Sequence, residues 1–589
     1  MTLAYGRAGK RRAGQRDDTA GLPPWLSLRR VPAAPFLPAL TILAALLFGA
    51  LPVLRLVLAA LMPGGRFAPD LALEALSSRA AVNATLHTLD TALCSALGAL
   101  VIGTVIALAI GVTDMRGKRP LAFGFVFSMM IAPQVAALAF LSLLAPQSSL
   151  LGALGLAPAP GTANPLLGRG GIVLVMALHH APLVAMTLWS GLRSIPQSLI
   201  EAAQLEGAGP ATITARIVLP VLRPQLIAAA LLAFVAGIGN FGIPALLGMP
   251  VNYLTLPTLI YRRLSSFGPE SLPEVAALAV LVGLVAALGI AAGLALSRRQ
   301  GGRVEIDRPL EPYWRLGPAR PAVSVALGLL LLLKLGLPLL ALLCDALTPA
   351  LGVPLSWQSL TFDKFAEVLL RQGVTIRALR NSFLFAAAAG VLLALGAIAF
   401  AYALERRLGR LRRAVELVTE LPYALPGVVL AIACILLFLK PLPLIGVSLY
   451  GTPFIILFAY LARFLPLALK APVAAMAQIE AHHEEAARLD GAGGWQMLRY
   501  IVAPILAPAA AVSALMVFLV AFNELTVSAL LWSSGTETLG VVLFSLKEAG
   551  LAGEAAAIAI SASAVILLAM LLLDRLGRRL PGHVLPWRV

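Results

Sequence analysis

Long apolar runs recur along the whole chain, and short breaks containing Pro, Gly and Arg separate them. Each run continues for roughly 20 residues, the length that a helix needs to cross the hydrocarbon core of a membrane. The pattern therefore predicts an all-α protein with twelve membrane-spanning helices. We expect these helices to begin near residues 36, 83, 121, 171, 225 and 274 in the first half of the chain, and near residues 322, 381, 414, 453, 505 and 556 in the second half.

Composition and charge agree with a membrane location. Hydrophobic residues make up 60% of the chain and charged residues 12%, a balance too apolar for a protein that folds in water alone. The net charge is +17, and most Lys and Arg fall on the side that both termini share, as the positive-inside rule expects of the cytoplasmic side. We interpret the basic clusters at 297–303 and 405–413 as topology signals and lipid-headgroup contacts. No nucleic-acid partner is predicted.

A polar segment interrupts the apolar pattern twice. The stretch "EAAQLEGAGPATITARIVLP" begins at residue 201 and "EAARLDGAGGWQMLRYIVAP" begins at residue 485, so the two copies are 284 positions apart. In the same register Pro182 matches Pro466, and Phe234 matches Phe518. A further echo at a different offset pairs "NATL" at residue 83 with "NSFL" at residue 381. We infer that two homologous six-helix domains are joined in one chain.

This duplication predicts the domain boundaries. A basic N-terminal segment precedes the first apolar run, and a polar stretch with several Pro residues separates the two homologous domains. We expect both termini to be cytoplasmic. The predicted units are a cytoplasmic segment at 1–35, a first six-helix domain at 36–297, a cytoplasmic linker at 298–320, a second six-helix domain at 321–576 and a cytoplasmic tail at 577–589.

Each polar segment has the residue types of a loop that meets a partner on the cytoplasmic side. Its glycine would permit a sharp turn between two short helices, and its paired alanines would allow another surface to approach closely. Its leucine would offer an apolar knob, and its glutamate a charge for an Arg of the partner. The predicted contact residues are Glu201, Ala202, Ala203, Leu205 and Gly207 in the first copy, and Glu485, Ala486, Ala487, Leu489 and Gly491 in the second.

These residues resemble the EAA signature of ATP-binding-cassette import permeases of the type I architecture. In that signature Glu-Ala-Ala, a Gly four residues beyond the second Ala and an Ile-x-x-Pro tail form the coupling helix that docks on the ATPase subunit. Both copies fit, with "IVLP" and "IVAP" as their tails. The resemblance implies a multi-pass permease of the bacterial inner membrane, two copies of a separate ATPase subunit and a periplasmic substrate-binding protein.

The same resemblance implies that this chain is not an enzyme and binds no cofactor, because ATP and Mg are used by the partner ATPase. The nearest approach to a phosphate-binding loop is "GVTDMRGKR" at 111–119. That stretch has one residue too many before its Gly-Lys pair and lacks the Ser or Thr that should follow. ATP is therefore expected on another subunit.

Four further segments narrow the resemblance to the ferric iron importers. They are "FGIPALLG", "YLTLPTLIYRRL", "NELTVSALLW" and "TETLGVVLF". By this similarity the substrate is Fe(III), passed on by the binding protein. Related fused permeases import thiamine or 2-aminoethylphosphonate, and these substrates stay open as alternatives. A self-contained transporter driven by an ion gradient is a second alternative, although it would not need two exposed EAA loops.

Polar residues within the apolar runs are candidates for the transport pathway, because they are costly in hydrocarbon. The repeat register pairs His179 with Arg463, and Asn240 with Glu524. We hypothesise that Asn240 and Glu524 line the interface between the halves, with Arg463 close enough to neutralise Glu524. The alternative is a buried pair that only fixes helix packing.

Overall fold

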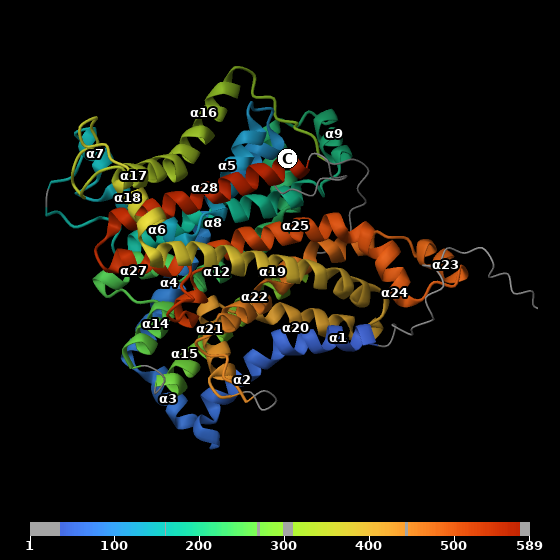
Figure 1. Ribbon diagram of the computed structural model, residues 1–589. Coiled ribbons are helices and arrows are strands. Elements are labelled where there is room, and N and C mark those ends of the chain that lie inside the picture. The colour runs from blue at the N-terminus through green and yellow to red at the C-terminus, as the bar shows by residue number, and fades with distance from the viewer. Residues whose placement is uncertain (1–35, 160, 268–270, 299–309, 442–445, 578–589) are drawn as a thin grey trace, which may run out of the picture.

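A computed structural model describes the chain except for residues 1–35, 160, 268–270, 299–309, 442–445 and 578–589 (Figure 1). Regular structure in the described residues is helical, apart from one isolated bridge between Thr113 and Trp314. Ten helices are long and apolar enough to span a membrane, and two bent helix pairs raise the number to as many as twelve. The predicted all-α membrane fold is confirmed. The predicted N-terminal segment and almost all of the predicted tail lie outside the described residues.

The first half of the chain contains a π-helical turn in its first long helix and another close to its polar segment. Its helices are α1 (Phe36–Ala45), η1 (Leu46–Ala50), α2 (Leu51–Leu61), η2 (Pro63–Gly65), α3 (Pro69–Ser77), α4 (Arg79–Val112), α5 (Lys118–Met130), α6 (Pro133–Leu144), α7 (Ser149–Ala153), α8 (Arg169–Leu192), α9 (Gln197–Leu205), α10 (Pro210–Ile213), η3 (Thr214–Val218), α11 (Leu219–Val221), α12 (Arg223–Ile238), α13 (Gly242–Leu247), η4 (Met249–Val251), α14 (Leu256–Phe267) and α15 (Leu272–Arg298).

The second half repeats this order. Its helices are η6 (Gly317–Ala319), α16 (Arg320–Leu331), η7 (Leu332–Gly336), α17 (Leu337–Ala346), α18 (Asp363–Ala366), η8 (Glu367–Arg371), α19 (Gly373–Arg406), η9 (Gly409–Leu411), α20 (Arg412–Ala424), α21 (Gly427–Phe438), α22 (Pro453–Ala477), α23 (Ala481–Leu489), α24 (Gly494–Met497), η10 (Leu498–Val502), α25 (Ala503–Phe522), α26 (Ser528–Leu531), α27 (Leu539–Glu548) and α28 (Ala552–Gly577).

One long helix organises each half. Helix α4 packs against α8 and α12, and its counterpart α19 packs against α22 and α25. Figure 1 shows α19, α25 and α28 running along the length of the molecule. Helices α9 and α23 lie at one end of this length, and α7 and α18 lie at the opposite end. The two polar segments therefore protrude from a common end.

Two predicted spans, those starting near residues 121 and 414, are broken, which the prediction of single helices did not anticipate. Two residues separate the end of α5 from the start of α6 at Pro133. Two residues, the second of them Pro426, separate α20 from α21. The residues before these prolines, Ala132 and Leu425, have ψ angles of 143° and 139°. Proline disfavours a helical conformation in the residue before it, so each break follows from the sequence. The two parts of the second broken span meet at 101°.

Two equivalent hydrogen bonds, one from each half, correct the predicted pairing of "NATL" at residue 83 with "NSFL" at residue 381. The backbone N–H of Leu256 donates to the Thr88 hydroxyl over 2.8 Å, and the N–H of Leu539 donates to the Ser382 hydroxyl over 2.8 Å. Thr88 therefore corresponds to Ser382, an offset of 294. The pairing of "NATL" with "NSFL" is wrong by four residues, about one helical turn. A shift of one turn keeps the same helix face, so a short match cannot exclude it.

The first long helix of each half packs against the other half. Segments η1 and α2 contact α20, α21 and α22, while α16 and α17 contact α5 and α6. Small residues make these contacts close, as is common between membrane helices. A Cβ atom added to Gly49 would lie within 3.0 Å of the Val418 carbonyl, and one added to Gly124 would lie within 3.0 Å of the Leu331 side chain. The two halves are therefore interlocked.

We predict that Gly49→Ala destabilises the purified protein, because its new methyl group would overlap the backbone of Val418, which cannot move aside cheaply. Such overpacking costs about 1–3 kcal/mol, which thermal unfolding in detergent would report as a lower melting temperature. The matched control is Gly328→Ala on α16, where the added atom meets nothing within 4 Å. That variant should melt at or above the wild-type temperature. Equal melting of Gly49→Ala and the wild type would contradict the interlocked packing.

Candidate functional site

The two polar segments end their first helices in the same way. Gly207 has a φ of +79° and Gly491 a φ of +81°, in the left-handed region that glycine tolerates best. The N–H of Ala208 donates to the Ala203 carbonyl over 2.9 Å, the long-range bond of a Schellman helix end. In the second copy Ala492 donates to the Ala487 carbonyl, also over 2.9 Å. The predicted glycine turn between two short helices is therefore present in both copies.

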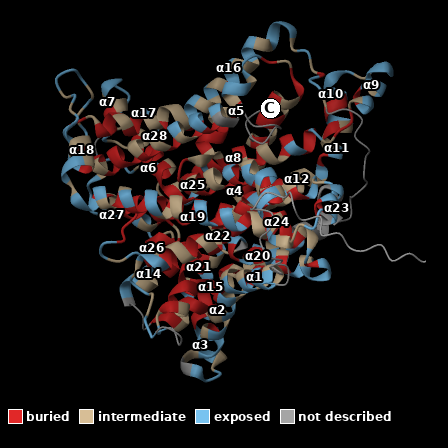
Figure 2. Ribbon diagram, turned by 45° about the vertical axis from the view of Figure 1, so that its right-hand side comes forward, coloured by how far each residue is buried: buried red, intermediate tan, exposed pale blue. Residues whose placement is uncertain are grey.

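The side chains of the two segments face outward. Leu205 is 90% exposed and Leu489 is 88% exposed. The rest of the motif follows the same pattern, with Glu201, Ala202, Glu485 and Ala486 exposed, Ala203 half-buried and Ala487 buried. Figure 2 shows the exposed colouring of α9 at the edge of the molecule, beyond the buried interior. Each segment thus exposes one apolar side chain and one carboxylate. Contact of these side chains with an ATPase subunit stays a prediction.

The two segments are anchored differently. Nε of Arg406 donates to Oε1 of Glu484 over 2.6 Å, and Nη2 of Arg406 donates to the Ile479 carbonyl over 2.5 Å. The offsets of 294 and 284 place Val112 and Ile200 at the corresponding positions of the first half, and both of these side chains are fully buried. The first half thus has two buried apolar side chains at the positions where the second half has the ion pair. Sequence reasoning missed this role of Arg406, which lies in a basic cluster interpreted as a topology signal.

Asn240 and Glu524 lie at equivalent breaks, each two residues beyond the end of its helix, α12 or α25. The N–H of Ile243 donates to Oδ1 of Asn240 over 3.1 Å. The N–H of Val527 donates to both carboxylate oxygens of Glu524, over 3.1 and 3.0 Å, and the N–H of Ser528 donates over 3.3 Å. Each side chain therefore satisfies backbone donors at the start of a short buried helix, α13 or α26. In a membrane such donors have no water to bond to.

Arg463 does not form the predicted ion pair with Glu524. Among the described residues no bond of 4.0 Å or less joins the two side chains. The Glu524 carboxylate instead bonds to the backbone and to the Thr526 hydroxyl. Arg463 lies beside the α20–α21 break, since a Cβ atom added to Gly427 would meet both Arg463 and Thr526. The buried Nη1 of Arg463 has no hydrogen-bond partner among the residues described.

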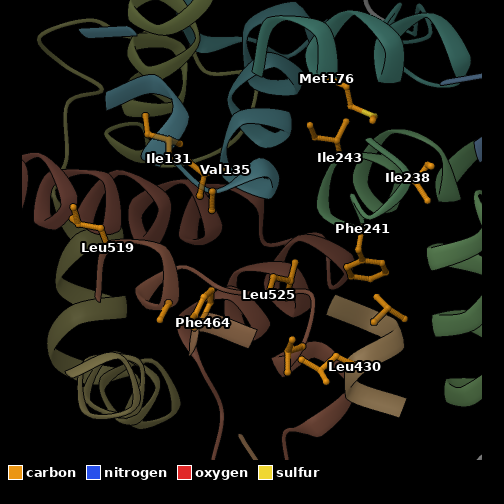
Figure 3. Packing of buried hydrophobic residues seen from close by; sticks show 14 of the residues in the cluster. Ile131, Val135, Met176, Ile238, Phe241, Ile243, Leu430, Phe464, Leu519 and Leu525 are labelled. Atoms are coloured by element: carbon orange, nitrogen blue, oxygen red, sulfur yellow. The ribbon is translucent and has the colours of Figure 1, made fainter. Parts of the chain in front are cut away.

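The breaks of one half contact those of the other. Nε2 of Gln134, at the start of α6, donates to the Asn523 carbonyl over 3.0 Å. A Cβ atom added to Gly239 would touch Pro426 at 3.4 Å. Figure 3 shows Phe241 and Leu525, which directly follow the two polar residues of the breaks, among buried apolar side chains from both halves. The four breaks therefore meet in one cluster, which we call the break cluster. Gln134 was not singled out from the sequence, although an intramembrane amide beside a proline was a visible signal.

His179, the register partner of Arg463, lies in a different setting. It lines a cavity of about 20 Å³ together with Ser128 and Lys334. Nζ of Lys334 donates to the Ser128 hydroxyl over 2.6 Å, a bond between the first helix of the second half and α5 of the first. A cavity of this size can hold about one water molecule. The arrangement is a polar contact within the interlock.

The described residues contain no group of three or more His, Cys, Asp or Glu side chains placed to hold a metal ion. Cys94, Cys344 and Cys434 form no disulfide bonds. In the break cluster the side-chain oxygens of Asn240 and Glu524 accept backbone bonds, whereas Nδ2 of Asn523 and Nη1 of Arg463 have no partner among the described residues.

Comparison with known proteins identifies the architecture. The model of the family described as "Binding-protein-dependent transport system inner membrane component" matches residues 99–306 and 393–583, one stretch in each half. A protein of Sinorhizobium fredii named "Probable ABC transporter permease protein y4fN" is 27% identical over 523 residues, which cover 85% of this chain and 88% of that protein.

The relatives named after a substrate include a ferric and a 2-aminoethylphosphonate permease. "Putative ferric transport system permease protein FbpB 1" of Haemophilus influenzae is 26% identical over 475 residues, covering 78% of this chain and 71% of that protein. "Putative 2-aminoethylphosphonate transport system permease protein PhnU" of Salmonella typhi is 29% identical over 226 residues, covering 37% of this chain and 74% of that protein. Because the family model matches both halves and more than half of the sequence, the chain belongs to the inner-membrane components of binding-protein-dependent transport systems, as an ABC import permease with two fused permease domains.

Proposed function

We propose that this permease is the membrane subunit of an ATP-driven importer that moves Fe(III) from a periplasmic binding protein to the cytoplasm. The observation that carries the proposal is the pair of motif segments, each with an exposed leucine before a left-handed glycine turn, at one end of a duplicated membrane fold. The assignment of Fe(III) as the substrate is supported by the ferric relative, whose similarity extends over 78% of the chain and so includes both halves.

Leu205 and Leu489 are the proposed docking points for two copies of a separate ATPase. A leucine that is about nine-tenths exposed gains most if a partner's groove covers it. The neighbouring Glu201 and Glu485 would each meet a basic group at the rim of that groove. ATP and Mg²⁺ would be held by the ATPase subunits, with no cofactor and no hydrolysis on this chain. The motif end would then be cytoplasmic, with both termini on that side, and the binding protein would dock at the opposite end.

The break cluster is the proposed hinge region of alternating access. Rigid bodies that rotate against each other need breaks whose backbone groups stay satisfied during the motion. Asn240 and Glu524 supply acceptors within their own segments, so each break can move as a unit. Their bonds favour the packing role over direct contact with the substrate. Arg463 would lie next to the pathway without neutralising Glu524.

We place high-affinity iron binding on the partner protein, with only weak contacts along the path through this chain. Fe(III) prefers carboxylate and phenolate oxygens, and the break cluster offers one carboxylate that is already bonded to backbone amides. Import of 2-aminoethylphosphonate is the second candidate, supported by a relative that covers 37% of the chain. Thiamine import would use the same architecture. Membership of the family argues against a transporter driven by an ion gradient.

The proposal is tested by ATP hydrolysis in liposomes that contain this chain and its ATPase, with binding proteins added in loaded and empty forms. We expect the Fe(III)-loaded protein to raise the rate at least fivefold over the empty form, because the loaded protein drives closure of the complex. Stimulation only by a protein loaded with 2-aminoethylphosphonate or thiamine would contradict the iron assignment. A Leu205→Ser, Leu489→Ser double variant should lose the stimulation. The matched control Leu568→Ser changes an exposed leucine within α28, outside the motifs, and should keep it.

Glu524 variants separate packing from transport. Glu524→Gln keeps an oxygen that can accept the Val527 N–H, so uptake and melting temperature should stay close to wild type. Glu524→Leu leaves buried donors unpaired, which costs about 1–3 kcal/mol and should lower the melting temperature. The matched change Asn240→Leu frees only the Ile243 N–H and should cost less. Loss of uptake in a normally stable Glu524→Gln variant would contradict the packing role.

A further inference from the structure

The described part of the predicted linker, residues 310–320, lies against the first half of the chain. We call this segment the strap. The N–H of Trp314 donates to the Val112 carbonyl over 3.0 Å, and the Trp314 carbonyl accepts from the N–H of Asp114 over 3.1 Å. These bonds form the isolated bridge at Thr113. The strap is thereby fixed to the end of α4, directly beside the α4–α5 loop.

The strap also touches both flanks of the first motif segment. The N–H of Glu311 donates to Oε1 of Gln197, the first residue of α9, over 3.0 Å. The hydroxyls of Tyr313 and Thr214 lie 2.8 Å apart, and Thr214 is the first residue of η3. The Thr214 hydroxyl donates to the Pro210 carbonyl, so the Tyr313 hydroxyl is the donor to Thr214. Tyr313 is only 7% exposed, which keeps water from competing for this bond.

A carboxylate ties the strap to the first helix of the second half. Asp114 accepts the N–H of Leu316 over 2.9 Å and pairs with Arg320, the first residue of α16. The bond to Arg320 lowers the pKa of Asp114 to about 2, so its charge is present throughout the neutral range. The Ser324 hydroxyl, one turn further along α16, lies 3.0 Å from the Arg116 carbonyl and 3.0 Å from the Arg320 carbonyl, and it can donate to either. The α4–α5 loop and the start of α16 are therefore held together.

In the second motif segment Arg406 pairs with Glu484. The apolar cluster that contains Ala487 also packs against Leu37 of the first half. Beyond the strap, α16 packs against α5, and Lys334 continues the contact by bonding to Ser128. Helix α6, which follows α5 across the break, carries the Gln134 that reaches Asn523. A continuous set of contacts thus leads from the first motif segment to the break cluster through the second half's first helix.

We propose that the strap is a coupling element, in which Tyr313 and Asp114 are positioning residues that transmit displacement of the first motif segment to α16. The first motif segment is then connected through the strap to the first helix of the second half as well as to its own half. This inference rests on the proposed function for its last step, because displacement is assigned to the ATPase. The strap contacts themselves do not depend on it.

The first test uses the full chain in nanodiscs without ATPase. Amide hydrogen exchange should rise at least tenfold at 203–214 in Tyr313→Phe, which removes only the donor hydroxyl, and stay unchanged at 487–498. Tyr402→Phe is the matched control. Within the described part of the chain, the buried Tyr402 hydroxyl has a hydrogen bond only with Arg407. It should leave 203–214 unchanged. Unchanged exchange at 203–214 in both Tyr313→Phe and Asp114→Asn would overturn the strap, whatever the fate of the proposed function.

The second test uses the complete transporter and measures substrate imported per ATP hydrolysed. Tyr313→Phe and Asp114→Asn should each lower this ratio two- to fivefold while basal hydrolysis stays at the wild-type rate. A stabilising contact without a coupling role would leave the ratio unchanged, so faster exchange with an unchanged ratio would overturn the positioning role. Failure of the proposed function is recognised separately, because wild-type protein would then show no stimulated hydrolysis.

Discussion

The packing of each half's first helix against the other half is the constraint on which the rest of this structure depends. Helices α1 and α2 of the first half pack on α20–α22 of the second, and helices α16 and α17 of the second half pack on α5 and α6 of the first. Each half therefore buries part of its surface only by contact with the other. Glycine at the closest crossing, Gly49, lets the helices approach to backbone distance. Motion between the halves is then limited to rotations that keep these crossings intact.

Within this interlock, proline and capping side chains decide where the spans bend. A membrane leaves no water for freed backbone groups, so a break must bring its own acceptors and donors. Pro133 and Pro426 end helical conformation at the third spans, and Asn240 and Glu524 bond the amides freed at the fifth. Because the four breaks meet near Gln134 and Asn523, the places where the chain can hinge are gathered between the halves.

Much of this architecture could be predicted from the sequence, and the physical reason differs from one feature to the next. Run length predicts spans because a bilayer has one thickness, and Gly207 predicts a left-handed turn because few other residues tolerate it. The bond from Arg406 to Glu484 joins residues 78 positions apart, and no local pattern predicts such a partner. The same holds for Gln134 with Asn523. The expected pair of Arg463 and Glu524 did not form because the Glu524 carboxylate is taken up by backbone amides of its own segment and by the Thr526 hydroxyl.

The central claim is that the two motif segments drive the interlocked halves against each other. It is tested most directly by pulsed electron resonance between spin labels at positions 206 and 490, exposed and equivalent residues beside the two glycine turns, in a cysteine-free chain reconstituted with its ATPase. The account predicts that ATP binding shortens this distance by several ångströms and that hydrolysis restores it. An unchanged distance distribution in a complex that hydrolyses ATP and imports substrate would contradict the account.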